Sequence, residues 1–308
     1  MTITAKIIAD SISEEGIRIT SMQLRYPRFI HAELMTHRVF SRNASSSRAI
    51  PVERLIEDII NDTAMPIHWG KNQKGMQANE ECFEPIILFD ENKYNPSGKD
   101  AWNIARDHAI RIAQGFVKAG YHKQIVNRLL EPFSHINVLV TSTEWNNFCE
   151  LRRHKDAQPE IHELADRMWE AMEASKPTLL KAGDWHLPYI TDEEKHEAFG
   201  RSYFDYGAAE KLRQCSVARC ARVSYLTFEG KPPNIENDMK LFAQLVGARP
   251  LHASPAEHQA TPDRKMRYSA SDEEGWQNTG IKWFEPHLHG NFTGWIQNRK
   301  LLELSVFS

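Results

Sequence analysis

Alternating hydrophobic and polar positions predict β-strands at the start of the chain. Residues 6–10 form a short apolar run, and residues 17–26 alternate apolar with polar side chains, as a half-buried strand does. A run rich in β-branched residues at 136–141 predicts a third strand. The chain therefore begins with sheet-forming segments and returns to the sheet after a long interval.

Apolar residues at helical spacing predict most of the remaining elements. Helices are expected at residues 27–35, 52–60, 100–119, 121–132, 142–153, 156–173 and 235–245. The interval from about residue 65 to 98 is rich in Gly, Pro, Asn and charge, which predicts a long loop. This succession predicts an α/β (α+β) fold in which a mixed β-sheet is flanked by helices.

Composition narrows the class of protein. The 308 residues suffice for one large or two ordinary domains, and 41% hydrophobic with 26% charged residues is typical of a globular protein. A net charge of −3 argues against general coating of nucleic acid. No apolar run approaches the roughly 20 residues that span a bilayer, and the first residues lack the order of a signal peptide. Together with four cysteines, which suggest reduced thiols, these features predict a soluble cytoplasmic enzyme.

Residues 36–48 concentrate cationic and hydroxyl side chains. The segment holds three arginines, one histidine, four serines and one asparagine, without a carboxylate. It follows the predicted helix 27–35, where a polar loop is expected. Guanidinium groups and hydroxyls in this density favour a polyanionic ligand, and phosphate is the commonest such ligand. A solvated basic loop or a nuclear-type basic patch is the alternative interpretation.

The same segment resembles the signature of the flavin-dependent thymidylate synthases, R-H-R-x-x-S-x-N-x-x-S-x-R-Y. The matching residues are His37, Arg38, Ser41, Asn43, Ser46 and Arg48, with every interval kept. Thr36 replaces the first arginine and Ala49 replaces the closing tyrosine. The resemblance implies that the matches up to Asn43 line the flavin site. It also implies that Ser46 and Arg48 hold a deoxynucleotide near its phosphate.

A second region resembles the same family. Residues 128–132, 147–152 and 157–161 are similar to its R-I-V-L-P-L, N-F-x-N-L-R and A-Q-W-E-I runs, in the same order. The resemblance implies that Arg152 contacts the pyrimidine and that Arg128 reaches the nucleotide phosphate from a neighbouring subunit. Asn147 is assigned to the cofactor site, and Asp156 stands where the family has a flavin-contacting histidine. Without the signature, both arginines would be interpreted as helix-surface charges.

Two further segments resemble family motifs in an unexpected place. Residues 218–225 contain A-R-V-S-Y and residues 252–258 read H-x-S-P-x-E-H, but in the family both precede the signature. This order suggests a circular permutation or an internal duplication. Residues 290–300, which resemble the helix before the signature, favour duplication. The resemblance places Ser224, His252 and Ser254 in the flavin site. We expect one half at residues 1–175 and another at 205–308, packed as one intertwined unit.

The candidate residues also limit the chemistry. The spacing of His252, Glu257 and His258 is not H-E-x-x-H, so no metal site is predicted. Carbon C5 of a pyrimidine is a weak nucleophile, and the chain lacks a Pro-Cys-His motif that would activate it through a cysteine. The flavin route needs no such group, because the cofactor supplies the difficult chemistry.

The resemblance therefore implies conversion of dUMP to dTMP, with FAD as cofactor and NADPH and methylenetetrahydrofolate as co-substrates. Arg152 and Ser46 are the candidate catalytic residues. Glu33, Ser46, Arg48, Arg128 and Arg152 are the candidate substrate contacts. Family sites lie between subunits, so a homo-oligomer is expected.

Two departures leave alternatives open. Glu33 stands where the family often has glutamine, and Ala44 replaces a frequent glutamate. A carboxylate can accept from the exocyclic amine of cytosine, so methylation or hydroxymethylation of dCMP at C5 is the second hypothesis. The third hypothesis is a nucleotide- or RNA-binding protein without catalysis.

Overall fold

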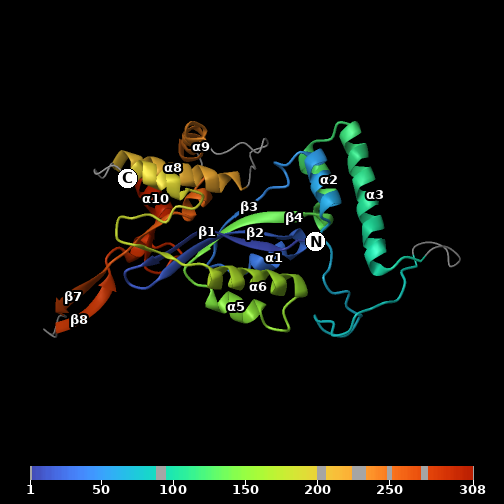
Figure 1. The fold of residues 1–308 in the computed structure, drawn as a ribbon, viewed down its shortest axis with the longest axis horizontal. Helices are drawn as coiled ribbons and strands as arrows, with labels where there is room; N and C mark the ends of the chain where they lie inside the picture. The colour runs from blue at the N-terminus through green and yellow to red at the C-terminus, as the bar shows by residue number, and fades with distance from the viewer. Residues whose placement is uncertain are drawn as a thin grey trace.

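The largest sheet among the described residues is mixed and has five strands in the order β3-β4-β2-β1-β5. The computed structural model describes residues 2–87, 95–199, 206–223, 234–247, 252–271 and 277–307. The strands are β1 (Thr4–Ser13), β2 (Arg18–Pro27), β3 (Ser41–Ala44), β4 (His135–Ser142) and β5 (Thr178–Leu180). β5 runs parallel to β1 and the other neighbours are antiparallel (Figure 1).

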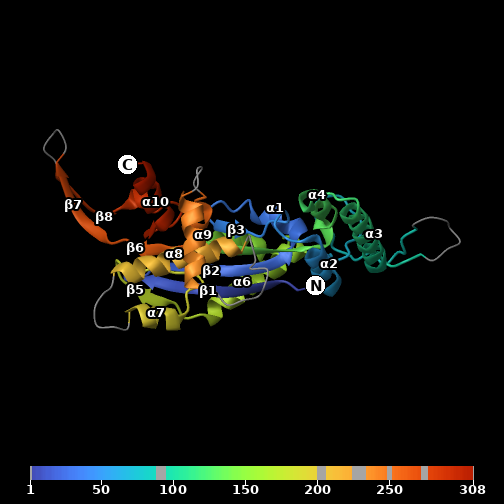
Figure 2. The ribbon, with the colours of Figure 1, turned by 90° about the horizontal axis from the view of Figure 1, so that it is seen from above.

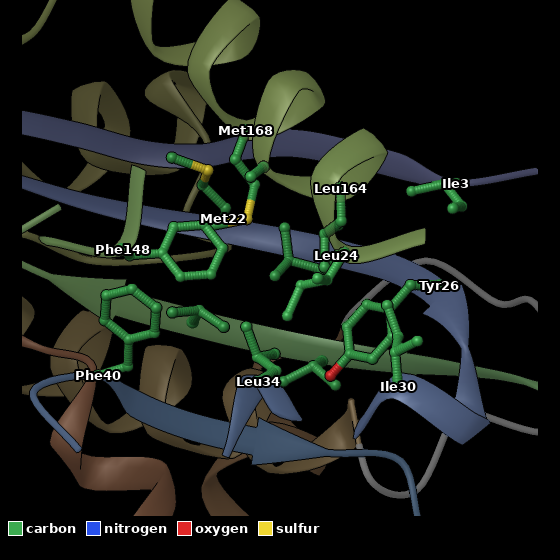
Figure 3. Close-up of a cluster of buried hydrophobic side chains, with 14 of the residues drawn as sticks. Ile3, Met22, Leu24, Tyr26, Ile30, Leu34, Phe40, Phe148, Leu164 and Met168 are labelled. Atoms are coloured by element: carbon green, nitrogen blue, oxygen red, sulfur yellow. The ribbon is translucent and has the colours of Figure 1, made fainter. Parts of the chain in front are cut away.

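One face of this sheet carries the main hydrophobic core. Side chains alternate along a strand, so every second residue of β2 and β4 points to this face. Helices α5 (Asn146–Arg152) and α6 (Pro159–Ala174) cover it, and Leu164 and Met168 of α6 lie against β2 (Figure 3). The strand residues of this core are Met22, Leu24, Tyr26, Ile136, Val138 and Val140. Each large side chain buried here contributes about 1.5–3 kcal/mol.

The opposite face is covered by the second half of the chain. Ile19 of β2 packs against Ala260 and Trp295, and Leu139 of β4 packs against Cys220 at the end of α8 (Tyr206–Arg222). In Figure 1, α8 and α10 (Asn298–Phe307) lie on the other side of the sheet from α6. The sheet is therefore the middle of three layers, and its two faces are covered by different parts of the sequence.

The two ends of the molecule carry smaller units (Figure 2). At one end, α2 (Val52–Asn61), α3 (Gly98–Lys118) and α4 (Lys123–Val126) share a separate apolar cluster. At the other end, β7 (Lys265–Ser271) and β8 (Gln277–Trp283) form a projecting two-stranded ribbon. The described residues also form α7 (Asp192–Phe199), α9 (Ile235–Gly247), β6 (Ala260–Pro262), β9 (Trp295–Gln297) and a 3-10 turn at Pro286–Leu288.

The mixed sheet flanked by helices confirms the predicted fold class, but the structure departs in part from three local predictions. Residues 27–35 form a 3-10 turn (Arg28–Ile30) and a single helical turn, α1 (His31–Leu34). Residues 121–132 form α4 and two 3-10 turns (Asn127–Leu129 and Glu131–Phe133), because the buried Asn127 amide bonds to the Ser47 and Ile50 carbonyls. The polar loop expected after residue 36 contains strand β3, since its residues alternate between buried and half-buried positions.

The loop predicted from about residue 65 to 98 is confirmed where it is described. Residues 65–87 and 95–97 contain only an isolated bridge between Gly70 and Glu81. By contrast, residues 290–300 form a turn, strand β9 and the start of α10, so they do not repeat the structure of residues 28–34.

Candidate active site

Strand β3 fixes the centre of the signature at the edge of the sheet. It pairs with β4, and its inward side chains, Ser41 and Asn43, are buried. The amide of Asn43 donates to the Cys220 carbonyl at 3.1 Å. Ser41 donates to Asn291 at 3.1 Å and accepts from Gln297 at 3.3 Å. Both side chains are thus bonded within the protein, and they join the signature to the C-terminal half.

Arg152 connects the signature to helix α5. Its Nε donates to Nε2 of His37 at 2.9 Å, and its Nη2 donates to the Thr36 hydroxyl at 3.2 Å. Its Nη1 forms an ion pair with the carboxylate of Glu33 on α1. Short segments far apart in sequence therefore hold one guanidinium in a fixed orientation. The pair is still accessible, since the side chains of Arg152 and Glu33 are 18% and 28% exposed.

His37 is held in its neutral form by its surroundings. Burial lowers its pKa, and the nearby Arg152 and Arg42 guanidiniums lower it further. The ring packs edge-on against Phe148, with the ring centres 4.9 Å apart. His37 therefore accepts from Arg152 and does not act as a cation.

The residues expected near the phosphate lie around the exit from β3. Arg48 is exposed and Ser46 is half-buried, whereas Arg38, an expected cofactor contact, is exposed just before β3. Arg128 is exposed as well, but it donates to Glu131 at 2.9 Å, and the same carboxylate oxygen accepts from Ser47 at 2.7 Å. Arg128 is thus already paired with a carboxylate of its own chain.

A cleft of about 1170 Å³ opens beside Glu33 and Arg152. One wall comes from the loop between α2 and α3, and the other comes from the segment joining α5 to α6. The amide of Gln77 donates to the Asp156 carbonyl at 2.9 Å, which ties the two walls together. Phe29 and Trp102 supply aromatic surface, with ring centres 6.4 Å apart. The cleft is large enough for a nucleotide-sized ligand.

Comparison with known families identifies the segment that carries this geometry. Residues 17–178, more than half of the chain, match the family model Thy1, thymidylate synthase complementing protein. The chain belongs to the Thy1 family. The matched residues contain β2, the signature, helix α5 and Arg152, whereas residues 218–225 and 252–258 lie outside the match.

Solved structures similar to this Thy1 family member include two of the UMP/dUMP methylase PolB from Streptomyces cacaoi. The complex with 5-Br UMP is 16% identical, with a TM-score of 0.39, and the match covers 56% of this chain and 88% of PolB. The complex with 5-Br dUMP is 18% identical, with a TM-score of 0.39, covering 56% and 90%. The flavin-dependent thymidylate synthase ThyX from Helicobacter pylori, complexed with FAD and dUMP, is 16% identical, with a TM-score of 0.33, covering 50% and 67%. Comparison with curated proteins gives no match.

The other expected cofactor residues of this Thy1 family member lie on α5 and beside β3. Asn147 is exposed on α5. His252 and Ser254 are exposed just before and within a 3-10 turn (Ser254–Glu257), which packs beside β3. Ser224 lies outside the described residues.

No helix among the described residues is long and apolar enough to cross a membrane.

The sequence interpretation missed a buried polar chain that crosses the sheet. Ser11 lies 2.9 Å from Nδ1 of His186, whose Nε2 lies 2.8 Å from Ser21. The Ser21 hydroxyl lies 2.6 Å from Thr141, which lies 2.8 Å from Nδ1 of His258. Burial lowers the pKa of each histidine to about 3, so both rings are neutral. The available signal was the hydroxyl residues Ser21 and Thr141 in two predicted strands, with Ser11 directly after the third.

Proposed function

We propose that this Thy1 family member is a flavin-dependent methyltransferase that modifies C5 of a pyrimidine nucleotide. In the first form of the proposal it converts dUMP to dTMP. Methylenetetrahydrofolate is then the carbon donor and NADPH the reductant. The observation that carries the proposal is the Arg152 guanidinium, which is held between the signature and α5 at the rim of a nucleotide-sized cleft. Both segments lie within the family match.

The residues around β3 fit an anionic dinucleotide cofactor. Arg38, Asn147, His252 and Ser254 present exposed donors, and a guanidinium suits a pyrophosphate. Ser41 and Asn43 support the site from within, because they fix β3 against the C-terminal half. When bound, FAD would supply hydride transfer and handling of the one-carbon unit.

In this proposal, the chain's own residues bind and orient the nucleotide. Ser46, Arg48 and Arg128 would hold the phosphate, with Arg128 supplied across a subunit boundary of a homo-oligomer. Arg152 would donate to the base, and its fixed orientation lowers the entropic cost of aligning the reacting ring.

The cysteines favour a route without a protein nucleophile. Cys149, Cys215 and Cys220 are buried, and burial raises the pKa of each thiol, to about 11 for Cys215. A buried thiol with a raised pKa contains little thiolate at neutral pH and is a poor nucleophile. Cys82 is exposed, but it lies in the loop between α2 and α3.

A visible absorption spectrum of the purified protein provides the first test. We expect flavin absorbance that bleaches on addition of NADPH without oxygen, and a C5-modified nucleotide when methylenetetrahydrofolate and a pyrimidine nucleotide follow. A protein that neither carries nor takes up FAD would overturn the proposal. Salt-dependent binding of RNA by such a colourless protein would instead favour a non-catalytic binding role.

A further inference from the structure

Glu33 and Arg152 together present both donors and acceptors to the cleft. A guanidinium carries five N–H groups, and Arg152 uses one on each nitrogen for His37, Glu33 and Thr36. Further N–H groups therefore remain on its two terminal nitrogens. Glu33 engages Arg152 through Oε1, and its carboxylate retains lone pairs that can accept. This arrangement matches the polar edge of a heterocycle that has a donor beside an acceptor.

The charges of the cleft suit the base of a nucleotide rather than its phosphate. Four carboxylate residues line it, whereas Arg152 and Lys155 are its only arginine and lysine among the described residues. The carboxylate residues are Glu33, Glu150, Asp156 and Glu160. An anionic phosphate would meet an excess of negative charge here. An uncharged ring with N–H groups would not be repelled by these carboxylates.

The cleft also offers a surface for the face of such a ring. Phe29 lies one helical turn before Glu33, and the residue is 36% exposed. Trp102 of α3 packs against Phe29 edge-to-face. A planar base can therefore contact aromatic surface while its polar edge meets Glu33 and Arg152.

We propose that Glu33 makes this site select a pyrimidine with an exocyclic amino group at C4, the cytosine class, over uracil. A carboxylate can only accept, so it stabilises an amino group and repels the lone pairs of a carbonyl at the same position. The free N–H groups of Arg152 complement the ring nitrogen N3 and the C2 carbonyl of cytosine, both acceptors. This inference rests on the proposed C5 methyltransferase activity, and it replaces dUMP by a cytosine nucleotide as the preferred substrate of that activity.

Binding of dCMP and dUMP to the FAD-loaded enzyme, measured by calorimetry, tests the selection. We expect dCMP to bind about tenfold or more tightly than dUMP, since a well-formed base contact discriminates to this extent. Glu33→Gln should move the ratio of the two affinities about tenfold toward dUMP, because an amide can donate to the C4 carbonyl. Glu33→Asp keeps the carboxylate and should keep the preference for dCMP. Glu57→Gln removes an exposed carboxylate on α2 and should leave the ratio unchanged.

The affinity ratio is internal to each variant, so a smaller folded fraction does not alter it. Preference for dUMP in the native enzyme, together with an unchanged ratio in Glu33→Gln, would overturn the inference. So would a failure to bind either nucleotide. Turnover is scored separately by mass spectrometry of the product. Selective binding of dCMP without C5 modification would contradict the proposed function while supporting the role of Glu33. Efficient methylation of dUMP with no effect of Glu33→Gln would support the proposed function and contradict the role of Glu33.

Discussion

Arg152 donates from Nε to Nε2 of His37 at 2.9 Å. The bond assigns the tautomer of the histidine, since Nε2 must carry the lone pair and the ring proton must lie on Nδ1. Protonation of Nε2 would place two donors face to face and break the contact. The orientation of Arg152 is therefore coupled to the neutral state of His37.

Arg152→Gln should raise the pKa of His37 toward its usual value. Burial is the largest cause of the lowered pKa and would remain, but the substitution removes the next cause, the Arg152 charge. Titration of the imidazole carbon protons by NMR measures the change. Arg153→Gln is the matched control, because Arg153 is paired with Asp166 instead. Equal His37 pKa values in the native protein and Arg152→Gln would contradict this coupling.

Arg48→Ala should weaken nucleotide binding and leave flavin bound. The exposed guanidinium of Arg48 follows β3 and is assigned to the phosphate. Loss of one charge-assisted contact costs about 1.5–3 kcal/mol, which is roughly a 10- to 150-fold loss in affinity. Calorimetry with the nucleotide and the flavin absorbance of the same sample measure both effects. Arg111→Ala, on the exposed side of α3, is the control. If Arg48→Ala and Arg111→Ala bind the nucleotide with equal affinity, Arg48 does not belong to the site.

The stability of the fold should fall steeply as the pH drops below about 6. Burial lowers the pKa of His186 and His258 to about 3 and that of His135 to about 4. Between these values and the unfolded value near 6.5, the unfolded chain binds protons that the native protein excludes. The stabilisation that comes from these neutral histidines is therefore fully present above about pH 6.5. It decreases by about 1.4 kcal/mol per pH unit for each histidine, or about 4 kcal/mol per unit for all three.

Urea unfolding between about pH 7 and 5 measures this slope, a range in which aspartates and glutamates contribute little. His135→Gln should reduce the slope by about a third, since one titrating group is lost. His108→Gln, exposed on α3, should leave the slope unchanged. A pH-independent unfolding free energy across this range would contradict the neutral state of the buried rings.

Gly294→Ala should destabilise the fold more than Gly16→Ala. The two glycines have nearly the same left-handed backbone, with φ of +72° and +75°, so both substitutions carry a similar conformational cost of about 1 kcal/mol. An added Cβ at Gly294 would meet Ile17 at 2.7 Å and Trp283 at 2.8 Å, whereas nothing lies within 4 Å at Gly16. Overpacking should add about 1–3 kcal/mol at Gly294 alone. Thermal unfolding of the two variants measures the difference, and equal losses would argue against this close packing.

The sequence predicted the parts of the fold that local pattern determines. Alternation along residues 17–26 and 136–141 identified the central strands, because one side chain in two faces a hydrophobic core. The intervals within residues 36–48, which match those of the family signature, pointed to the segment that contacts Arg152. Motif order could nominate both segments, since each lies within a short stretch of chain.

The remaining features depend on distant partners and have no local signature. Nothing in the neighbours of Asn43 indicates that its amide donates to Cys220, and nothing near Ser41 indicates Asn291. β3 also escaped prediction because its buried residues are polar. Their burial is compensated by hydrogen bonds from segments that local patterns cannot place.

The hydrogen-bond partners of β3 are synthesised long after β3 itself. Asn43 bonds to Cys220, which is translated 177 residues later, and Ser41 bonds to Asn291, which is translated 250 residues later. At about 5–20 residues per second, a ribosome needs roughly 10–50 s to supply that second partner. During this time the side chains of Ser41 and Asn43 lack the partners that bond to them in the native fold. The nascent signature strand therefore lacks its second partner until residue 291 has been made, and the later segment completes the signature rather than merely following it.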